Sequence, residues 1–134
     1  MIRFLTFTLL AVSISANAAT SKDLVKSTTT WDGHKLPPYS LVQPEVTIKE
    51  IIIEPGEKLP WHQHPVINAG VLISGELTVH TDKQLLKMEA GDSLVELVNT
   101  SHYGENTGKV PAKIIVFYLS EKNQKVTVID KTQH

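Results

Sequence analysis

The apolar and polar positions of the chain fall into short runs that end at turn-forming residues, as they do in β-strands. Apolar and β-branched residues gather in the runs 46–53, 71–79, 84–88, 94–98, 114–119 and 126–129. The run 114–119 is apolar throughout, which predicts a central strand buried on both faces. Gly75 interrupts another run and predicts a bulge or a tight bend. Since no long stretch repeats apolar residues at helical spacing, the pattern predicts an all-β sandwich or barrel.

Residues 1–18 have the pattern of a secretory signal rather than of a strand. A short basic start at Met1–Arg3 leads into a mostly apolar stretch, and Ala16-Asn17-Ala18 offers small residues at a cleavage site. We expect a signal peptide over 1–18 that is cleaved after Ala18, and a mature protein that is periplasmic or secreted. The apolar stretch is too short to span a bilayer. An uncleaved helix that anchors the protein to a membrane is the alternative.

Residues 19–44 form a polar and then turn-rich stretch ahead of the strands. The adjacent Pro37 and Pro38 exclude a regular helix there. We expect an N-terminal arm over 19–44 that packs on the barrel or on a partner subunit, with a surface loop as the alternative. Residues 45–120 then make the barrel core, and residues 121–134 a C-terminal strand and tail.

Composition narrows the set of partners. The chain has 134 residues, which fits one domain, and its lack of cysteine excludes disulfides and thiolate metal sites. Removal of residues 1–18 would take away Arg3, one of 13 basic residues, and none of the 14 acidic ones, so the mature net charge is near −2. We therefore expect neither nucleic acid nor, after signal cleavage, a membrane as a partner.

Three histidines are candidate metal ligands. His62 and His64 are two residues apart, and alternation along an extended segment turns both imidazoles to the same face. His102 follows the apolar run 94–98 and a polar turn, and it is the candidate for a third ligand. Three histidines with open positions suit a divalent transition metal, namely Zn, Fe, Mn, Ni or Cu. Two surface histidines at positions 62 and 64 are the alternative.

The spacing of these histidines and of nearby glycines resembles two motifs of the cupin family. The positions that match are Gly56, His62, His64, Gly75, Gly91, His102 and Asn106. Leu97 and Asn99 replace the proline and glycine of the second motif, and Asn68 replaces the glutamate of the first. The resemblance covers about residues 45–120. It implies an antiparallel jelly-roll barrel, often a homodimer, with a divalent metal on the histidines and small-molecule substrates entering at the barrel mouth.

The position of Asn68 changes the expected chemistry of the site. An amide oxygen is a weak, neutral ligand, so three histidines with Asn68 leave the charge of the cation uncompensated, which favours an anionic additional ligand. Glu96, within the apolar run 94–98, is the candidate carboxylate. We expect it to face the cavity as a neighbour of the ligands, as a ligand, or as a catalytic general base. A solvent-facing position on its strand is the alternative.

These features support more than one class of function, because fold analogy cannot choose the reaction. The first hypothesis is a metal-dependent cupin enzyme with oxygenase- or isomerase-type chemistry on a small, anionic organic molecule. The second is a non-catalytic periplasmic protein that binds a small molecule or a metal. A third is a barrel that has lost its metal and serves as a dimeric structural domain.

Overall fold

The computed structural model describes residues 19–132, so the predicted signal peptide over 1–18 lies outside the described residues. The elements of the described part are all strands, which confirms the prediction of an all-β chain. Residues 19–132 contain no helix with the length and apolar character needed to cross a membrane. The strands are β1 (Pro44–Ile53), β2 (His62–Gln63), β3 (Ile67–Ser74), β4 (Glu76–His80), β5 (Leu85–Glu89), β6 (Ser93–Val95), β7 (Tyr103–Glu105), β8 (Ala112–Glu121) and β9 (Val128–Ile129).

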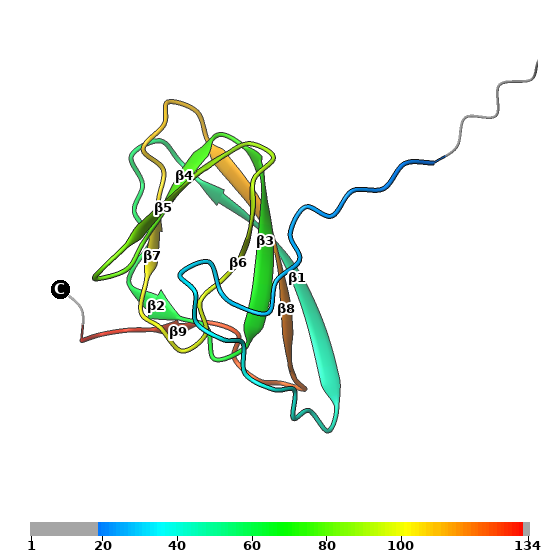
Figure 1. The fold of residues 1–134 in the computed structure, drawn as a ribbon. Coiled ribbons are helices and arrows are strands. Elements are labelled where there is room, and N and C mark those ends of the chain that lie inside the picture. Colours follow the sequence, from blue (N-terminus) through cyan, green and yellow to red (C-terminus); the bar gives the residue numbers. More distant parts are fainter. Residues whose placement is uncertain (1–18, 133–134) are drawn as a thin grey trace, which may run out of the picture.

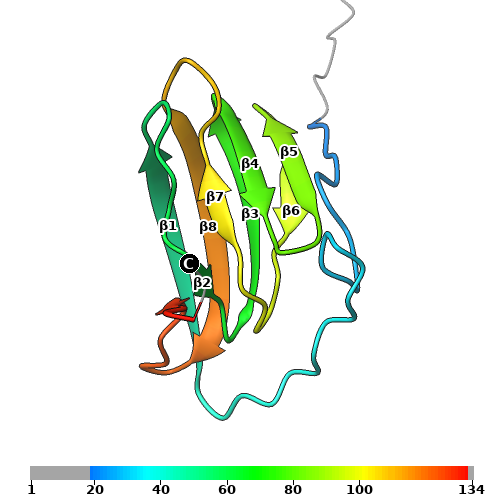
Figure 2. The same ribbon diagram turned by 90° about the vertical axis from the view of Figure 1, so that its left-hand side faces the viewer.

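The strands form two facing sheets and a small third one. The larger sheet has the order β1-β8-β3-β6, the second has the order β5-β4-β7, and β2 pairs with β9. All of these pairs are antiparallel. The two larger sheets lie opposite one another, and the β2–β9 pair lies near one end of the space between them (Figure 1 and Figure 2). This arrangement is consistent with the predicted jelly roll, in which neighbouring strands come from distant parts of the chain.

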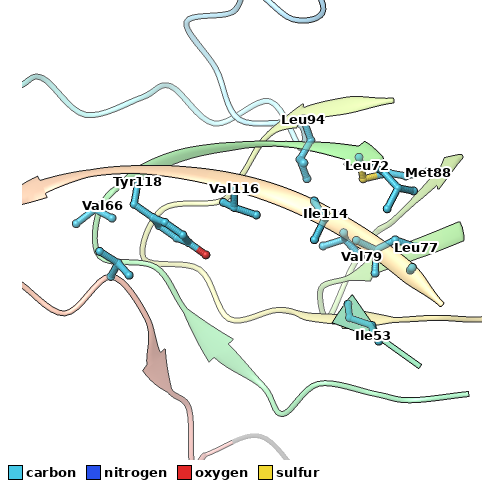
Figure 3. Close-up of a cluster of buried hydrophobic side chains, with 12 residues drawn as sticks. Ile53, Val66, Leu72, Leu77, Val79, Met88, Leu94, Ile114, Val116 and Tyr118 are labelled. Carbon is cyan, nitrogen blue, oxygen red and sulfur yellow. The ribbon is translucent and has the colours of Figure 1, made fainter. Parts of the chain in front are cut away.

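The core lies between the two sheets because inward-facing residues of both are apolar. Leu72 of β3, Ile53 of β1 and Leu77 of β4 are almost fully buried. They pack with residues of β8, among them Ile114 and Val116, in one continuous cluster (Figure 3). The same space continues towards the β2–β9 end, where polar side chains replace apolar ones.

The prediction that residues 114–119 are buried on both faces is wrong for the outer face. Ile114, Val116 and Tyr118 point inward and are buried, whereas Phe117 points outward and is 45% exposed. Val46 and Ile48 of β1 lie on the same outer face at 66% and 60% exposure. The sheet therefore carries apolar side chains on both faces, and the described chain leaves those of Val46, Ile48 and Phe117 on the outer face exposed.

The bend predicted at Gly75 is present between β3 and β4. Gly75 has a φ of 75°, and a Cβ atom there would lie 2.5 Å from the carbonyl oxygen of Pro111. The register between β3 and β8 also shifts between Leu72 and Ser74. Only glycine fits this crossing, because a side chain would meet both the positive φ and the backbone of the neighbouring strand.

The arm folds back onto the barrel as a small hairpin. A bridge joins Thr29 and Lys35, and Gly33 takes a φ of 95° at the turn. The backbone N–H of Trp31 donates to the carbonyl of Val95 in β6 over 2.9 Å. This part of residues 19–44 therefore packs on the barrel, as one of the two alternatives for the arm predicts.

Candidate metal centre

The three histidines come from two chain segments that are joined by backbone hydrogen bonds. His62 begins β2, and His102 immediately precedes β7. The N–H of each donates to the carbonyl of the other, over 2.9 and 3.0 Å. His64 is fixed to the second segment as well, because its carbonyl accepts the N–H of Asn99 over 2.8 Å. The pairing of the two segments thus places all three imidazoles at one point.

Asn99 explains one departure from the cupin motif. Its φ is 53°, in the left-handed region that favours glycine. Asparagine tolerates this region better than other side chains. The turn before His102 therefore keeps its geometry although the glycine of the motif is absent.

The three rings converge in the interior of the protein. The ring centroids of His62 and His64 are 4.9 Å apart, those of His62 and His102 4.5 Å, and those of His64 and His102 5.0 Å. All three residues are buried, and one ring nitrogen from each lies within 4.8 Å of the others. The alternative of two surface histidines is therefore wrong.

The second nitrogen of each ring is occupied by a backbone carbonyl. The Nδ1 atoms of His62, His64 and His102 lie 2.8 Å from the carbonyl oxygens of Pro60, Val126 and Thr100, respectively. A carbonyl only accepts hydrogen bonds, so each Nδ1 carries the proton and each neutral ring keeps its lone pair on Nε2. This is the arrangement of histidines that bind metal, whose other ring nitrogen is fixed by a hydrogen bond.

Burial keeps two of the rings in the form that binds a cation. Desolvation lowers the pKa of His62, and it lowers the pKa of His64 to about 3. Both rings are therefore neutral at pH 7. The Nε2 atom of His102 is buried and has no hydrogen-bond partner among the described residues, so its lone pair is open to a cation.

Asn68 and Glu96 are neighbours on the strands beside the histidines. The N–H of Glu96 donates to the carbonyl of Asn68 over 3.0 Å. The side-chain N–H of Asn68 donates to the carbonyl of Val66, and its Oδ1 atom is buried with no partner in the described chain. One carboxylate oxygen of Glu96, Oε2, lies 3.9 Å from Nε2 of His102. The solvent-facing alternative for Glu96 is wrong, since its side chain is 13% exposed and lines the same cavity as the histidines.

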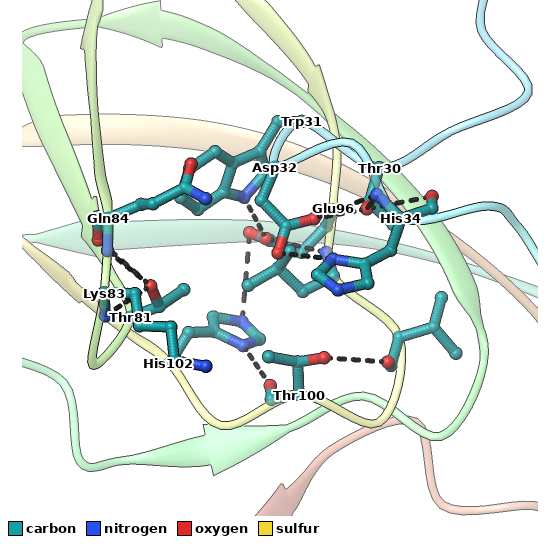
Figure 4. Close-up of polar contacts among 12 residues, drawn as sticks. Thr30, Trp31, Asp32, His34, Thr81, Lys83, Gln84, Glu96, Thr100 and His102 are labelled. Atoms are coloured by element: carbon teal, nitrogen blue, oxygen red, sulfur yellow. Dashed lines mark hydrogen bonds and ion pairs between the residues drawn. The ribbon is translucent and has the colours of Figure 1, made fainter.

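Trp31 belongs to this group of polar contacts, and the sequence pattern did not point to it. Its indole Nε1–H donates to Oε1 of Glu96 over 2.9 Å, and the backbone N–H of Leu97 donates to the same oxygen over 2.9 Å (Figure 4). The two partners are 65 residues apart in the chain. No local motif connects them, because the contact depends on where the arm hairpin packs.

The histidines open onto a cavity of about 220 Å³ between the sheets. Its polar lining consists of the three histidines, Asn68, Glu96, Tyr118 and Thr127. Aliphatic side chains make most of the remaining wall, including Ile51, Leu77 and Val116. Among the described residues, Glu96 is the one acidic residue that lines it, and no Lys or Arg does.

These residues fit a divalent transition metal. The donor set offers three neutral imidazole nitrogens, and such a set suits zinc and its neighbours in the first transition row. The orphaned Nε2 of His102 and Oδ1 of Asn68 are buried acceptors that a cation would satisfy. Within residues 19–132, His62, His64 and His102 are the group of potential metal ligands whose donor atoms lie close enough together to hold an ion.

Several solved structures have a fold similar to that of this barrel. A DMSP lyase, DddQ from Ruegeria pomeroyi DSS-3, shares 17% identity at a TM-score of 0.58, over 66% of this chain and 45% of the lyase. An oxalate oxidase in complex with the substrate analogue glycolate shares 26% identity at a TM-score of 0.52, over 63% of this chain and 45% of the oxidase. The match thus spans less than half the length of either enzyme.

A protein of similar size also matches. It is an uncharacterized conserved protein with a double-stranded β-helix domain from Klebsiella pneumoniae, with 21% identity and a TM-score of 0.54 over 70% of this chain and 90% of that one. Among curated proteins, none matches the chain. The Cupin_2 family, a cupin domain, matches residues 49–118, which contain all three histidines and Glu96. The chain therefore belongs to the cupin family.

Proposed function

We propose that this protein is a divalent-metal-dependent cupin enzyme, periplasmic or secreted, that acts on a small anionic organic molecule by oxygenase- or isomerase-type chemistry. The observation that carries the proposal is the set of three converging, buried imidazoles, each with its Nδ1 atom on a backbone carbonyl, at a mostly apolar cavity next to one carboxylate. The likeness to an oxalate oxidase, whose substrate analogue is glycolate, supports chemistry on a small carboxylate.

His62, His64 and His102 would hold the metal, with Asn68 or Glu96 as a further ligand. A divalent ion held by these residues would supply Lewis-acid chemistry and, if redox-active, chemistry with dioxygen. The chain itself supplies fixed ring orientations, a cavity with a mostly apolar wall, and one carboxylate. Because Oε1 of Glu96 already accepts two N–H groups, Oε2 is the oxygen that remains to accept a proton from a substrate as a general base.

The charges of the site indicate the class of substrate. Three neutral histidines add no charge, and the Glu96 carboxylate adds one negative charge, so a divalent ion here keeps a net charge of about +1. One singly charged anionic group would neutralise it. A second carboxylate would lie among aliphatic side chains with no Lys or Arg in the cavity lining, which costs several kcal/mol. Lys49 lies outside this lining, with its amine 5.7 Å from the centroid of the Tyr118 ring. We therefore favour a monocarboxylate with a short apolar body over a dicarboxylate.

The size of the cavity limits the length of the alkyl part of the proposed substrate. Ligand pockets for drug-sized molecules occupy about 300–1,000 Å³. The cavity of about 220 Å³ is smaller, so it suits a molecule of a few carbon atoms. Its walls offer contact to an alkyl group rather than to a polyol or a sugar.

Calorimetric titration of the metal-loaded protein tests this proposal. We expect propionate and isobutyrate to bind at least about 10-fold more tightly than oxalate or malonate, since each tenfold difference is only about 1.4 kcal/mol. Each mixture is then followed by NMR for conversion under air, with Glu96→Gln as the matched variant. Equal binding of both acid classes would contradict the proposed substrate class.

A non-catalytic periplasmic binder is the second candidate, favoured by the presence of Asn68 at the glutamate position of the family. In that case a ligand raises the melting temperature and is recovered unchanged by both the wild-type protein and Glu96→Gln. Conversion of the ligand by the wild-type protein would reject this candidate.

The apolar outer face of the large sheet supports a homodimer. β1 is an edge strand, and Val46, Ile48 and Phe117 form an exposed apolar patch on it and on β8. The ion pair between Lys113 and Glu50, 3.5 Å long, lies at the rim of this patch. A two-fold interface is self-complementary, so each copy can place both charges opposite those of the other. We propose that a second copy of this chain covers the patch.

A further inference from the structure

The geometry points to Trp31 as a positioning residue that orients the Glu96 carboxylate toward the metal centre. The inference rests on the proposed metal-binding function. It concerns the arm, which lies outside residues 49–118, the part of the chain that matches the cupin family. The arm would thus complete a site that the cupin barrel alone leaves with a freely rotating carboxylate.

The arm hairpin is built to hold Trp31 in one place. Thr30 is buried, and its hydroxyl donates to Asp32 and also lies 3.2 Å from the carbonyl of His34. Oδ2 of the Asp32 carboxylate lies 2.8 Å from Nδ1 of His34, which closes the turn. The Trp31 N–H then pairs with Val95, the residue immediately before Glu96. The hairpin is therefore fixed both internally and to the strand that carries the carboxylate.

The two carboxylate oxygens of Glu96 have different contacts. Oε1 accepts hydrogen bonds from the Trp31 indole and from the Leu97 backbone, both at 2.9 Å. Oε2 has neither donor and is the oxygen that lies 3.9 Å from Nε2 of His102 (Figure 4). Two donors on one oxygen fix the plane of the carboxylate, so the other oxygen faces the histidines.

The backbone donor alone cannot set this direction. The N–H of Leu97 belongs to the adjacent residue and leaves the side-chain torsions of Glu96 free to rotate about that contact. The indole of Trp31 approaches from a separate element and is packed against the core. It therefore removes the remaining freedom, which is how a neighbour of a ligand raises metal affinity.

The test is a double-mutant cycle of Co²⁺ affinity on the full chain, measured by calorimetry and by the visible spectrum of the bound ion. We expect Trp31→Phe to weaken Co²⁺ binding about 10-fold and to change the spectrum. In the Glu96→Gln background the same substitution should have less than about a twofold effect, because the oriented carboxylate is already gone. Trp61→Phe is the matched control, since that indole packs on Tyr103 and should leave affinity unchanged.

If Trp31→Phe does not fold, the indole N–H signals of the wild-type protein in a two-dimensional NMR spectrum provide a second test. The chain has two tryptophans, so a ¹⁵N-labelled sample gives two indole signals. We expect Glu96→Gln to shift the Trp31 indole signal, and Zn²⁺ to shift it in the wild type but not in Glu96→Gln. A Trp31 signal that is insensitive to both would overturn the inference.

Other outcomes separate this inference from the proposed function. If the wild-type chain binds no Co²⁺ or Zn²⁺, the proposed function itself fails. If the wild type binds the metal and Trp31→Phe binds it equally well, or loses the same affinity with and without the Glu96 carboxylate, only the positioning role of Trp31 fails.

Discussion

At the scale of single residues, the carboxylate beside the three histidines comes from a different chain segment from the one that the cupin motif indicates. Asn68 occupies the glutamate position on β3, and Glu96 lies directly beside it after β6. Both face the same cavity. The cluster of three histidines and the cavity-facing position of Glu96 could be predicted, because spacing and an acid within an apolar run are visible in the sequence. The contact to Trp31 could not, since it forms only when the arm packs.

Moving the carboxylate from position 96 to position 68 tests whether the two positions can serve the same role. Glu96→Gln should weaken binding of Zn²⁺ by about 10- to 100-fold, because the negative charge next to the ion is lost. The double variant Asn68→Glu with Glu96→Gln should recover most of that loss, since it returns one carboxylate to the cavity. Calorimetry at one pH and salt concentration measures both. If the double variant binds no better than Glu96→Gln, a carboxylate at position 68 does not replace one at position 96.

The buried histidines also set the acid stability of the metal-free protein. Desolvation lowers the pKa of His64 to about 3 in the folded state, whereas the unfolded side chain titrates near its ordinary value of about 6.5. The unfolded state therefore binds more protons between these two values, and stability falls as the pH falls through that window. We expect urea unfolding of the metal-free protein from pH 7 to pH 4.5 to show this loss, at up to about 1.4 kcal/mol per pH unit for each proton. The variant His64→Gln should flatten the dependence, and an unchanged slope would show that His64 is not buried as a neutral ring.

At the scale of the elements, most strands could be predicted from apolar runs, whereas β2 and β7 could not. β1, β3 and β8 are apolar runs that end at turn residues, so the sequence marks them. β2 and β7 are only two and three residues long and lie in no apolar run, whereas β9 lies within the predicted run 126–129. The predicted strand over 94–98 ends at Val95, because the chain leaves the sheet where Glu96 meets the arm. Burial of the outer face of β8 was wrongly predicted, since an apolar run does not show which faces the chain covers.

Gly75 gives the clearest test of an element boundary. Gly75→Ala should destabilise the protein by at least about 2 kcal/mol, because the new Cβ combines a strained φ with a clash against the backbone at Pro111. Gly91→Ala is the matched control. Its φ is 96°, but no atom lies within 4 Å of the added Cβ, so only the backbone strain of about 1 kcal/mol applies. Urea unfolding measures both, and equal losses would contradict the crossing described at Gly75.

At the scale of the whole molecule, the inner cavity and the apolar outer face have separate proposed roles. The family match accounts for the barrel, and the arm adds contacts that the family segment lacks. Export to the periplasm or beyond remains a prediction from residues 1–18. The outer face leads to the proposed dimer, because exposed apolar patches that cover several strands are typical of interfaces.

Light scattering coupled to gel filtration tests the dimer. We expect the wild-type chain to elute with the mass of two copies and Ile48→Lys to elute as a monomer, because the lysine would place a charge at the centre of the patch. Leu85→Lys is the control, since Leu85 is similarly exposed but lies on β5 in the other sheet. A monomeric wild-type protein at all concentrations would contradict the proposed dimer.

The metal content of the protein isolated from its native compartment tests the central claim most directly. We predict about one equivalent of a divalent transition metal per chain, lost in His64→Ala and His102→Ala because each removes a ligand. His80→Ala should keep it, since that ring stacks on Tyr103 away from the three histidines. Wild-type protein without stoichiometric metal, or equal metal content in the His102 and His80 variants, would contradict the account.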